Sequence, residues 1–433
     1  MSNIDVQVYG VEMVYVPQGT FYVGDGSSES TNGYRRSNTG SIAERTPPVF
    51  IQNGRTFPEG SYCWNGGPNN ETHDITTSQP AANYANGFSA FYMMKYPITQ
   101  IQYVEFLNTL TRTQQNARVA ANISSITSSN RYAMIQLYTP APDVTPISPA
   151  GANAPNRRNG VMALPQADPN SPVEFVCNLN DDQVYNNPDD DGLYIACNFL
   201  NVYDVYSYLA WSGLRPMTVM EFEKAARGAA NIGQLPTPGE YVWGTTTPPV
   251  YLDDKAGFDG SIAESCASSC GTKNQTGNLE GNLSRTNWPD GPVRVGALSM
   301  RGNDRVLSGA GYYGGMHMGD NVHDFCVNLF NNSTNPADVN GGGGGRRFNA
   351  QHGSGNLLPN GNYDSFGGSW PDPNYQLSAY RGVSIKGSCF FHGDERRQIS
   401  RHDILDDSND PNQQFRPNAR RSYLGGRGVR SAN

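Results

Sequence analysis

Two side chains, Cys389 and His392, could bind a metal ion by their type and spacing, since they stand three residues apart. A thiolate and an imidazole can both bind soft metal ions such as copper. One thiol does not reproduce a two-thiolate copper site, and a lone Cys and His in a loop more often pack and form hydrogen bonds. We therefore do not expect copper here, and a metal site built on this pair stays open as an alternative.

The other cysteines, histidines and carboxylates match no catalytic pattern. Cys266 and Cys270 are the close pair among seven cysteines, and without a second pair their spacing favours a local disulfide or two buried thiols over zinc. No Gly-x-Ser-x-Gly elbow occurs, and the glycine run 341–345 lacks the Lys-Ser/Thr of a phosphate-binding loop. Asp406 and Asp407 indicate a solvated turn.

Composition indicates a loop-rich globular protein. The 433 residues include 48 glycines and 29 prolines, and 16% are charged, against about 25% in average proteins. The net charge of −8 argues against nucleic-acid binding. No apolar run reaches the roughly 20 residues of a membrane helix, and no secretory signal is visible. We expect no membrane insertion, with synthesis in the cytoplasm or export by a route that the sequence does not show.

One helix is marked at both ends in the sequence. Thr218 can accept hydrogen bonds from the first turn, and Glu221, three residues on, completes a capping box. Phe222 and the pair at 225–226 recur at helical spacing and predict a packing stripe. Gly228 supplies the left-handed stop.

Other elements follow from similar patterns. Helices are predicted from Thr99 to about Thr111 and from the cap Asn201 through Ser212, and residues 11–24 alternate like a strand. The polar segments 25–88 and 139–192 are predicted to be loop insertions. Insertions of this kind serve as binding loops or as contacts with neighbouring subunits.

The run Gly213–Gly228 resembles the signature Gly-Arg-Leu-Pro-Thr-x-x-Glu-Trp-Glu-x-Ala-Ala-Arg-Gly of the formylglycine-generating enzyme (sulfatase-modifying factor) family. Other family landmarks are similar to segments that stand here in the family's order. They are Met13–Gly24, Phe91–Leu107, Tyr241–Gly244, Pro292–Gly296 and Asp320–Phe325. The resemblance therefore spans nearly the whole chain.

The resemblance implies an α+β fold. Members of the family have a C-type-lectin-like domain with two helices, small antiparallel sheets and much irregular loop. Residues 1–433 are then one elaborated domain, with insertions at 25–88 and 139–192 and a C-terminal segment over 381–430 that faces a ligand.

The resemblance also implies what chemistry to look for. Enzymes of the family oxidise a substrate cysteine with two copper-binding cysteines five positions apart, and Gly387 and His392 stand at those positions here. Cys389 is near, but it is alone. The His-x3-His-x-Glu motif of an iron-binding branch is absent. The chain therefore looks like a member without the enzymatic site.

Calcium is the cofactor that the resemblance favours, because the family commonly holds one or two structural calcium ions bound by oxygen ligands. Asn321 and Asp324 correspond to the Asn and Glu of the family's Gly-Asn-Val-Trp-Glu-Trp element. Asn282 and Asp290 lie just before the Pro-Val-Gly element, where another site is often found. Ordinary hydrogen bonding in loops is the competing interpretation.

The segment 381–430 is similar to the C-terminal part of the variable proteins of diversity-generating retroelements, which use this fold without the catalytic cysteines. It places aromatic rings beside charged groups, a mixture typical of contact hot spots. The predicted ligand-binding residues are Phe390, Phe391, His392, Asp394, Arg397, His402, Arg421 and Tyr423.

Three functions follow as hypotheses. The leading one is a non-catalytic, adhesin-like protein that binds a protein or glycan ligand on a cell surface and is displayed on a phage particle or cell-surface assembly. The second is a metal-dependent oxidase whose site is rebuilt around Cys389 and His392. The third is a structural subunit of a larger assembly, with 25–88 and 139–192 as intersubunit contacts.

Overall fold

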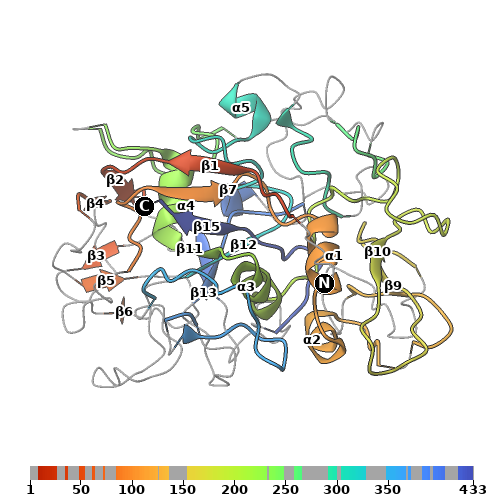
Figure 1. Ribbon diagram of the computed structural model, residues 1–433. Helices are drawn as coiled ribbons and strands as arrows, with labels where there is room; N and C mark the ends of the chain where they lie inside the picture. The colour runs from red at the N-terminus through yellow and green to blue at the C-terminus, as the bar shows by residue number, and fades with distance from the viewer. Residues whose placement is uncertain are drawn as a thin grey trace.

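A computed structural model (Figure 1) gives the architecture of most of the chain. The residues that it describes are 8–26, 35–37, 48–53, 61–63, 72–73, 84–124, 126–135, 154–231, 234–247, 258–265, 291–299, 304–327, 348–366, 369–371, 383–390, 394–404 and 418–432.

A seven-stranded sheet forms the centre of the molecule. Its strands stand in the order β1-β7-β15-β11-β12-β13-β14. Neighbours are antiparallel except β11 and β12, which are parallel. The strands are β1 (Met13–Val16), β7 (Phe91–Met94), β15 (Gly428–Ser431), β11 (Arg215–Thr218), β12 (Asp324–Val327), β13 (Val383–Lys386) and β14 (His402–Ile404).

Four of the helices begin at capping boxes, in which a side chain at the cap and one three residues on bond reciprocally to backbone amides. The boxes confirm the predicted starts at Thr99, Asn201 and Thr218, and a further one lies at Thr111. The helices in the described residues are α1 (Gln100–Asn108), α2 (Arg112–Arg118), α3 (Val202–Trp211), α4 (Val219–Arg227), α5 (Arg305–Ser308) and the 3-10 helix η5 (Asp394–Arg397).

Helices α3 and α4 pack on opposite faces of the central sheet. Figure 1 shows β1, β7 and β15 side by side with α4 next to them. On one face, the Lys224 ammonium of α4 lies 5.9 Å from the ring centroid of Phe91. On the other face, a Cβ added at Gly428 would lie 2.2 Å from Leu209 Cδ2 of α3. A larger residue at position 428 would therefore force the Leu209 side chain to move.

Three small sheets surround the central one. One joins β2 (Phe21–Val23) to β4 (Val49–Ile51). The other two have the orders β3-β5-β6 and β10-β9-β8. Their strands are β3 (Arg35–Ser37), β5 (Ser61–Cys63), β6 (Thr72–His73), β8 (Arg131–Tyr132), β9 (Val161–Ala163) and β10 (Phe175–Cys177).

These observations confirm the α+β class and correct its details. The described residues hold five short α-helices, and three small sheets lie beside the seven-stranded one. The segments 25–88 and 139–192, expected to be loop, contain β3 to β6 and β9 and β10. Among the described residues, no helix is both long and apolar enough to cross a membrane.

Candidate functional site

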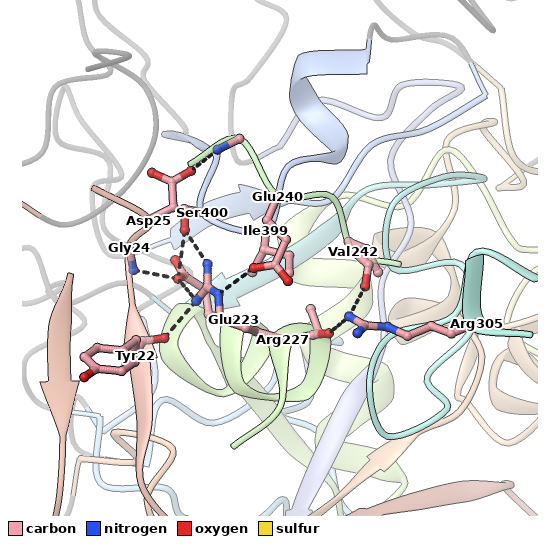
Figure 2. Close-up of polar contacts among 12 residues, drawn as sticks. Tyr22, Gly24, Asp25, Glu223, Arg227, Glu240, Val242, Arg305, Ile399 and Ser400 are labelled. Carbon is pink, nitrogen blue, oxygen red and sulfur yellow. Dashed lines mark hydrogen bonds and ion pairs between the residues drawn. The ribbon is translucent and has the colours of Figure 1, made fainter. Parts of the chain in front are cut away.

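Glu223 of α4 is the centre of a buried polar cluster (Figure 2). Its Oε2 atom accepts hydrogen bonds from the Gly24 amide at 2.8 Å, from Arg227 Nη1 at 3.1 Å and from Ser400 Oγ at 3.2 Å. Its Oε1 atom lies 3.4 Å from Lys386 Nζ, and both side chains are fully buried. Glu223 thus ties α4 to β2, β13 and the C-terminal segment.

Arg227 extends the same cluster by one turn of α4. Its guanidinium donates to the Tyr22 carbonyl at 2.8 Å, to Ser400 Oγ at 2.7 Å and to Glu240 Oε2 at 3.1 Å. Arg305 donates to the Val242 carbonyl at 2.6 Å, as Figure 2 shows. The loop that carries residues 240–242 is therefore fixed by two guanidinium groups.

Lys386 closes the cluster on the sheet side. Its ammonium donates to the Ile399 carbonyl at 2.6 Å and lies 5.2 Å from the ring centroid of Phe222. Burial lowers the pKa of Lys386, and the neighbouring carboxylate of Glu223 opposes that shift. Glu223 and Arg227 of the Gly213–Gly228 motif therefore form an internal cross-link between α4 and the segments around it.

A second buried cluster surrounds Asp324 of β12. Arg427 donates from Nε to Asp324 Oδ2 at 2.8 Å and from its terminal nitrogens to the carbonyls of Met316 and His317. Asp324 Oδ1 has no hydrogen-bond partner. Burial raises the pKa of Asp324 to about 6, although the Arg427 charge acts in the opposite direction.

The predicted calcium ligands do not form one group in the described residues. The amide group of Asn321 is used by the chain, since it accepts from the Val293 amide at 2.9 Å and donates to the Val293 carbonyl at 3.1 Å. Asp324 is paired with Arg427. Asn282 and Asp290 lie outside the described residues. Calcium binding at these four positions therefore stays a prediction.

Four of the predicted ligand-binding residues are buried: Phe390, Arg397, Arg421 and Tyr423. Phe391 and His392 lie outside the described residues, and of Asp394 and His402 only the backbone is described. Any contact surface on the segment 381–430 must therefore be formed by side chains other than these buried four.

The described thiols are also internal. Cys177, Cys197, Cys326 and Cys389 are buried, and burial raises the pKa of the first three. Cys389 is fully buried. Within the described ranges, no three His, Cys, Asp or Glu side chains are grouped so that they could hold a metal ion.

Exposed aromatic rings lie instead on the α3 side of the central sheet. Tyr15 of β1 stands directly opposite Tyr92 of β7, and Tyr92 stands opposite Arg430 of β15. The two rings are 5.2 Å apart between centroids, and 51% of Tyr15 and 41% of Tyr92 is exposed. Directly opposed residues share a face of a sheet. We call Tyr15, Tyr92 and Arg430 the aromatic ladder.

Sequence reasoning missed the aromatic ladder, although a signal for it existed. Both tyrosines fall in segments that alternate like strands, and their neighbours Val16, Phe91 and Met93 are buried. Period-two alternation places Tyr15 and Tyr92 on the outer face. The cross-strand register that brings them together cannot be obtained from alternation, because it depends on pairing between distant segments.

The fold and the site define an α+β protein with a charged interior cluster and an exposed aromatic ladder. No family model matches the sequence, and no curated protein does. The solved structure of PvdO from Pseudomonas aeruginosa is similar at TM-score 0.37 and 13% identity, covering 97% of this chain and 94% of that chain. The crystal structure of CarF is similar at TM-score 0.32 and 12% identity, covering 98% and 99%. Superpositions this loose establish no shared fold.

Proposed function

We propose that this chain is a non-catalytic binding protein that recognises a protein or glycan ligand on a cell surface. The aromatic ladder is the observation that carries the proposal. Tyrosine rings offer a large contact area for little lost side-chain entropy, and tyrosine and arginine are the residues most enriched in binding hot spots. Tyr15, Tyr92 and Arg430 supply these residues side by side, on a rigid sheet.

The proposal includes a scaffold of the C-type-lectin-like, formylglycine-generating-enzyme type. The motif Gly213–Gly228 supports it, since Glu223 and Arg227 of that motif hold α4, β2 and the segment near Ser400 together. A phage particle or cell-surface assembly that displays the protein is the proposed setting, because a ligand on another cell requires presentation outside the producing one.

The lack of an enzymatic role is also part of the proposal. The positions of the family's copper-binding cysteines hold Gly387 and His392, and Cys389 is buried. The alternative of a rebuilt oxidase predicts steady aldehyde formation when the protein is incubated with copper and a cysteine peptide. The binding proposal predicts none.

The test is binding of the purified protein to whole cells and to a glycan panel, beside the double variant Tyr15→Ala/Tyr92→Ala. Loss of one hot-spot side chain costs about 2 kcal/mol or more, which is roughly 30-fold in affinity. We expect at least that loss for the double variant. Because both rings are half-exposed, we expect its circular dichroism spectrum and melting temperature to stay close to those of the parent.

The matched control is Tyr312→Ala, which removes a tyrosine ring that is 54% exposed outside the ladder. It should bind as the parent does. Equal binding by the parent and the double variant would contradict the assignment of the ladder. Binding by none of the three proteins would favour the structural-subunit hypothesis.

A further inference from the structure

The loop that follows β10 concentrates acidic side chains. Asp181, Asp182, Asp189, Asp190 and Asp191 all lie between the end of β10 and Gly192. The loop is closed locally, since the Asn187 amide donates to Asp191 Oδ2 at 2.7 Å and the Asp191 amide donates to the Asn187 carbonyl at 3.0 Å. Its last residue is anchored by the Gly192 amide, which donates to the Gly260 carbonyl at 3.0 Å.

The two ends of this loop come together. The Tyr132 hydroxyl donates to the Asn178 carbonyl at 2.8 Å and to Asp181 Oδ1 at 3.0 Å. Burial and the charges of Asp181 and Asp191 raise the pKa of Tyr132. A Cβ added at Gly192 would lie 3.0 Å from Leu179 Cδ2, so Gly192 packs against the Leu179 side chain. Asp191, which precedes Gly192, therefore lies near the start of the loop.

Three buried oxygen atoms in this loop accept no hydrogen bond: Asn178 Oδ1, Asp190 Oδ1 and Asp191 Oδ1. Asn178 and Asp191 are fully buried. Buried carboxylate and amide oxygens that accept no hydrogen bond, in a loop with three further aspartates, are suited to bind a cation.

We propose that Asn178, Asp190 and Asp191 bind a calcium ion through these three oxygens. Calcium accepts carboxylate, amide and carbonyl oxygens in irregular geometry and fills the rest of its shell with water. Zinc prefers nitrogen and sulfur ligands, which this loop does not offer. The proposed ligands are two carboxylates and one amide. No group of three His, Cys, Asp or Glu side chains occurs in the described residues, and a site with two such side chains does not conflict with that. The proposed ligands are different residues from the calcium ligands that the sequence suggested.

The ion would fasten the acidic loop to the helical part of the molecule. Immediately after the loop, the Leu193 carbonyl accepts from the Ile101 amide and the Ile195 carbonyl accepts from the Gln100 amide, each at 3.0 Å. Figure 1 shows β10 and α1 together, on the side of the molecule away from β2 and β4. Calcium therefore stabilises the folded chain by binding it in preference to the unfolded one.

The first experiment measures the melting temperature of the full chain after treatment with EDTA and dialysis, in calcium chloride or magnesium chloride. At a calcium concentration about 100-fold above Kd we expect a rise of about 3 °C. Magnesium should give a smaller rise, because it demands octahedral geometry. Asp191→Asn should abolish the rise, and Asp189→Asn, which changes an exposed side chain of the same loop, should keep it.

The second experiment uses terbium, whose emission is sensitised by a nearby tyrosine such as Tyr132. The parent should emit when tyrosine is excited and lose that emission when calcium is added, and Asp191→Asn should not emit. If Asp191→Asn does not fold, Asp190→Asn takes its place in both experiments. No calcium-dependent rise in the parent would overturn the proposal, and so would a rise that the Asp191 or Asp190 variant retains.

Discussion

Glu223 supplies the counter-charge for two cations in the interior, and its replacement by Gln tests the cluster. Its carboxylate lies 3.4 Å from Lys386 Nζ and 3.1 Å from Arg227 Nη1. Removing one partner of a buried ion pair costs about 3–5 kcal/mol, because the remaining charge is left uncompensated. We expect Glu223→Gln to lower the free energy of unfolding by that amount in urea denaturation.

Glu12 provides the matched control for Glu223. Glu12 pairs with Lys95 at 2.7 Å, but its side chain is 58% exposed. Exposed ion pairs contribute about 0–1 kcal/mol. Glu12→Gln should therefore lower the free energy of unfolding by less than about 1 kcal/mol. Similar losses in both variants would mean that the interior cluster is not held by charge.

The raised pKa of Asp324 predicts that the stability of the protein depends on pH. Its pKa is about 6 in the folded protein and about 4 in an unfolded chain. Between these values the folded state holds more protons, so the free energy of unfolding decreases as pH rises from 4 to 6. The stability associated with the protonated form is fully present below pH 4 and lost above pH 6.

Asp324→Asn isolates this contribution. At pH 4 the Asp324 carboxyl of the folded parent is protonated and therefore as uncharged as the amide of the variant. The stability deficit of the variant relative to the parent should shrink by up to about 3 kcal/mol between pH 4 and pH 6, since only the parent loses the proton. Urea denaturation of both proteins at several pH values measures the difference. A deficit that does not change with pH would show that the pKa of Asp324 is not raised.

At the scale of elements, the capping box at Thr218 should contribute more stability than the one at Thr111. Thr218 Oγ1 accepts from the Glu221 amide at 3.1 Å and also donates to the Ala85 carbonyl at 2.7 Å, inside the protein. The Thr111 box is exposed. We expect Thr218→Ala to cost about 2 kcal/mol and Thr111→Ala about 0.5–1 kcal/mol. Chemical denaturation gives both values, and equal losses would be the contrary result.

The capping boxes explain which helices could be predicted from the sequence. Thr99, Asn201 and Thr218 begin helices that the sequence already indicated, because a cap and an apolar stripe are local signals. Helix α2 was missed, because its buried residues are Arg112, Gln115 and Arg118 and it has no apolar stripe. Strand β11 was missed because pairing with β12 and β15, far away in sequence, makes it a strand.

At the scale of the whole molecule, the fold class could be predicted from the sequence, but the burial of the expected site residues could not. The motif indicated an α+β protein, which the sheets and helices confirm. Arg397 and Arg421 were expected to face a ligand because the segment 381–430 places aromatic rings beside charged groups. Both are buried. Whether a charged side chain lies inside depends on partners that other segments bring, and a single sequence does not show those partners.

Strand β15 lies between β7 and β11 in the central sheet. Among the described strands, β15 is synthesised last. The ribosome therefore makes β7 and β11 more than 200 residues before it makes β15, the strand that lies between them. Until then, the unpaired edges of both are open to wrong partners, and exposed edges of this kind promote aggregation. Slower translation therefore lengthens the time for which the edges of β7 and β11 stay open, and faster completion of the chain shortens it.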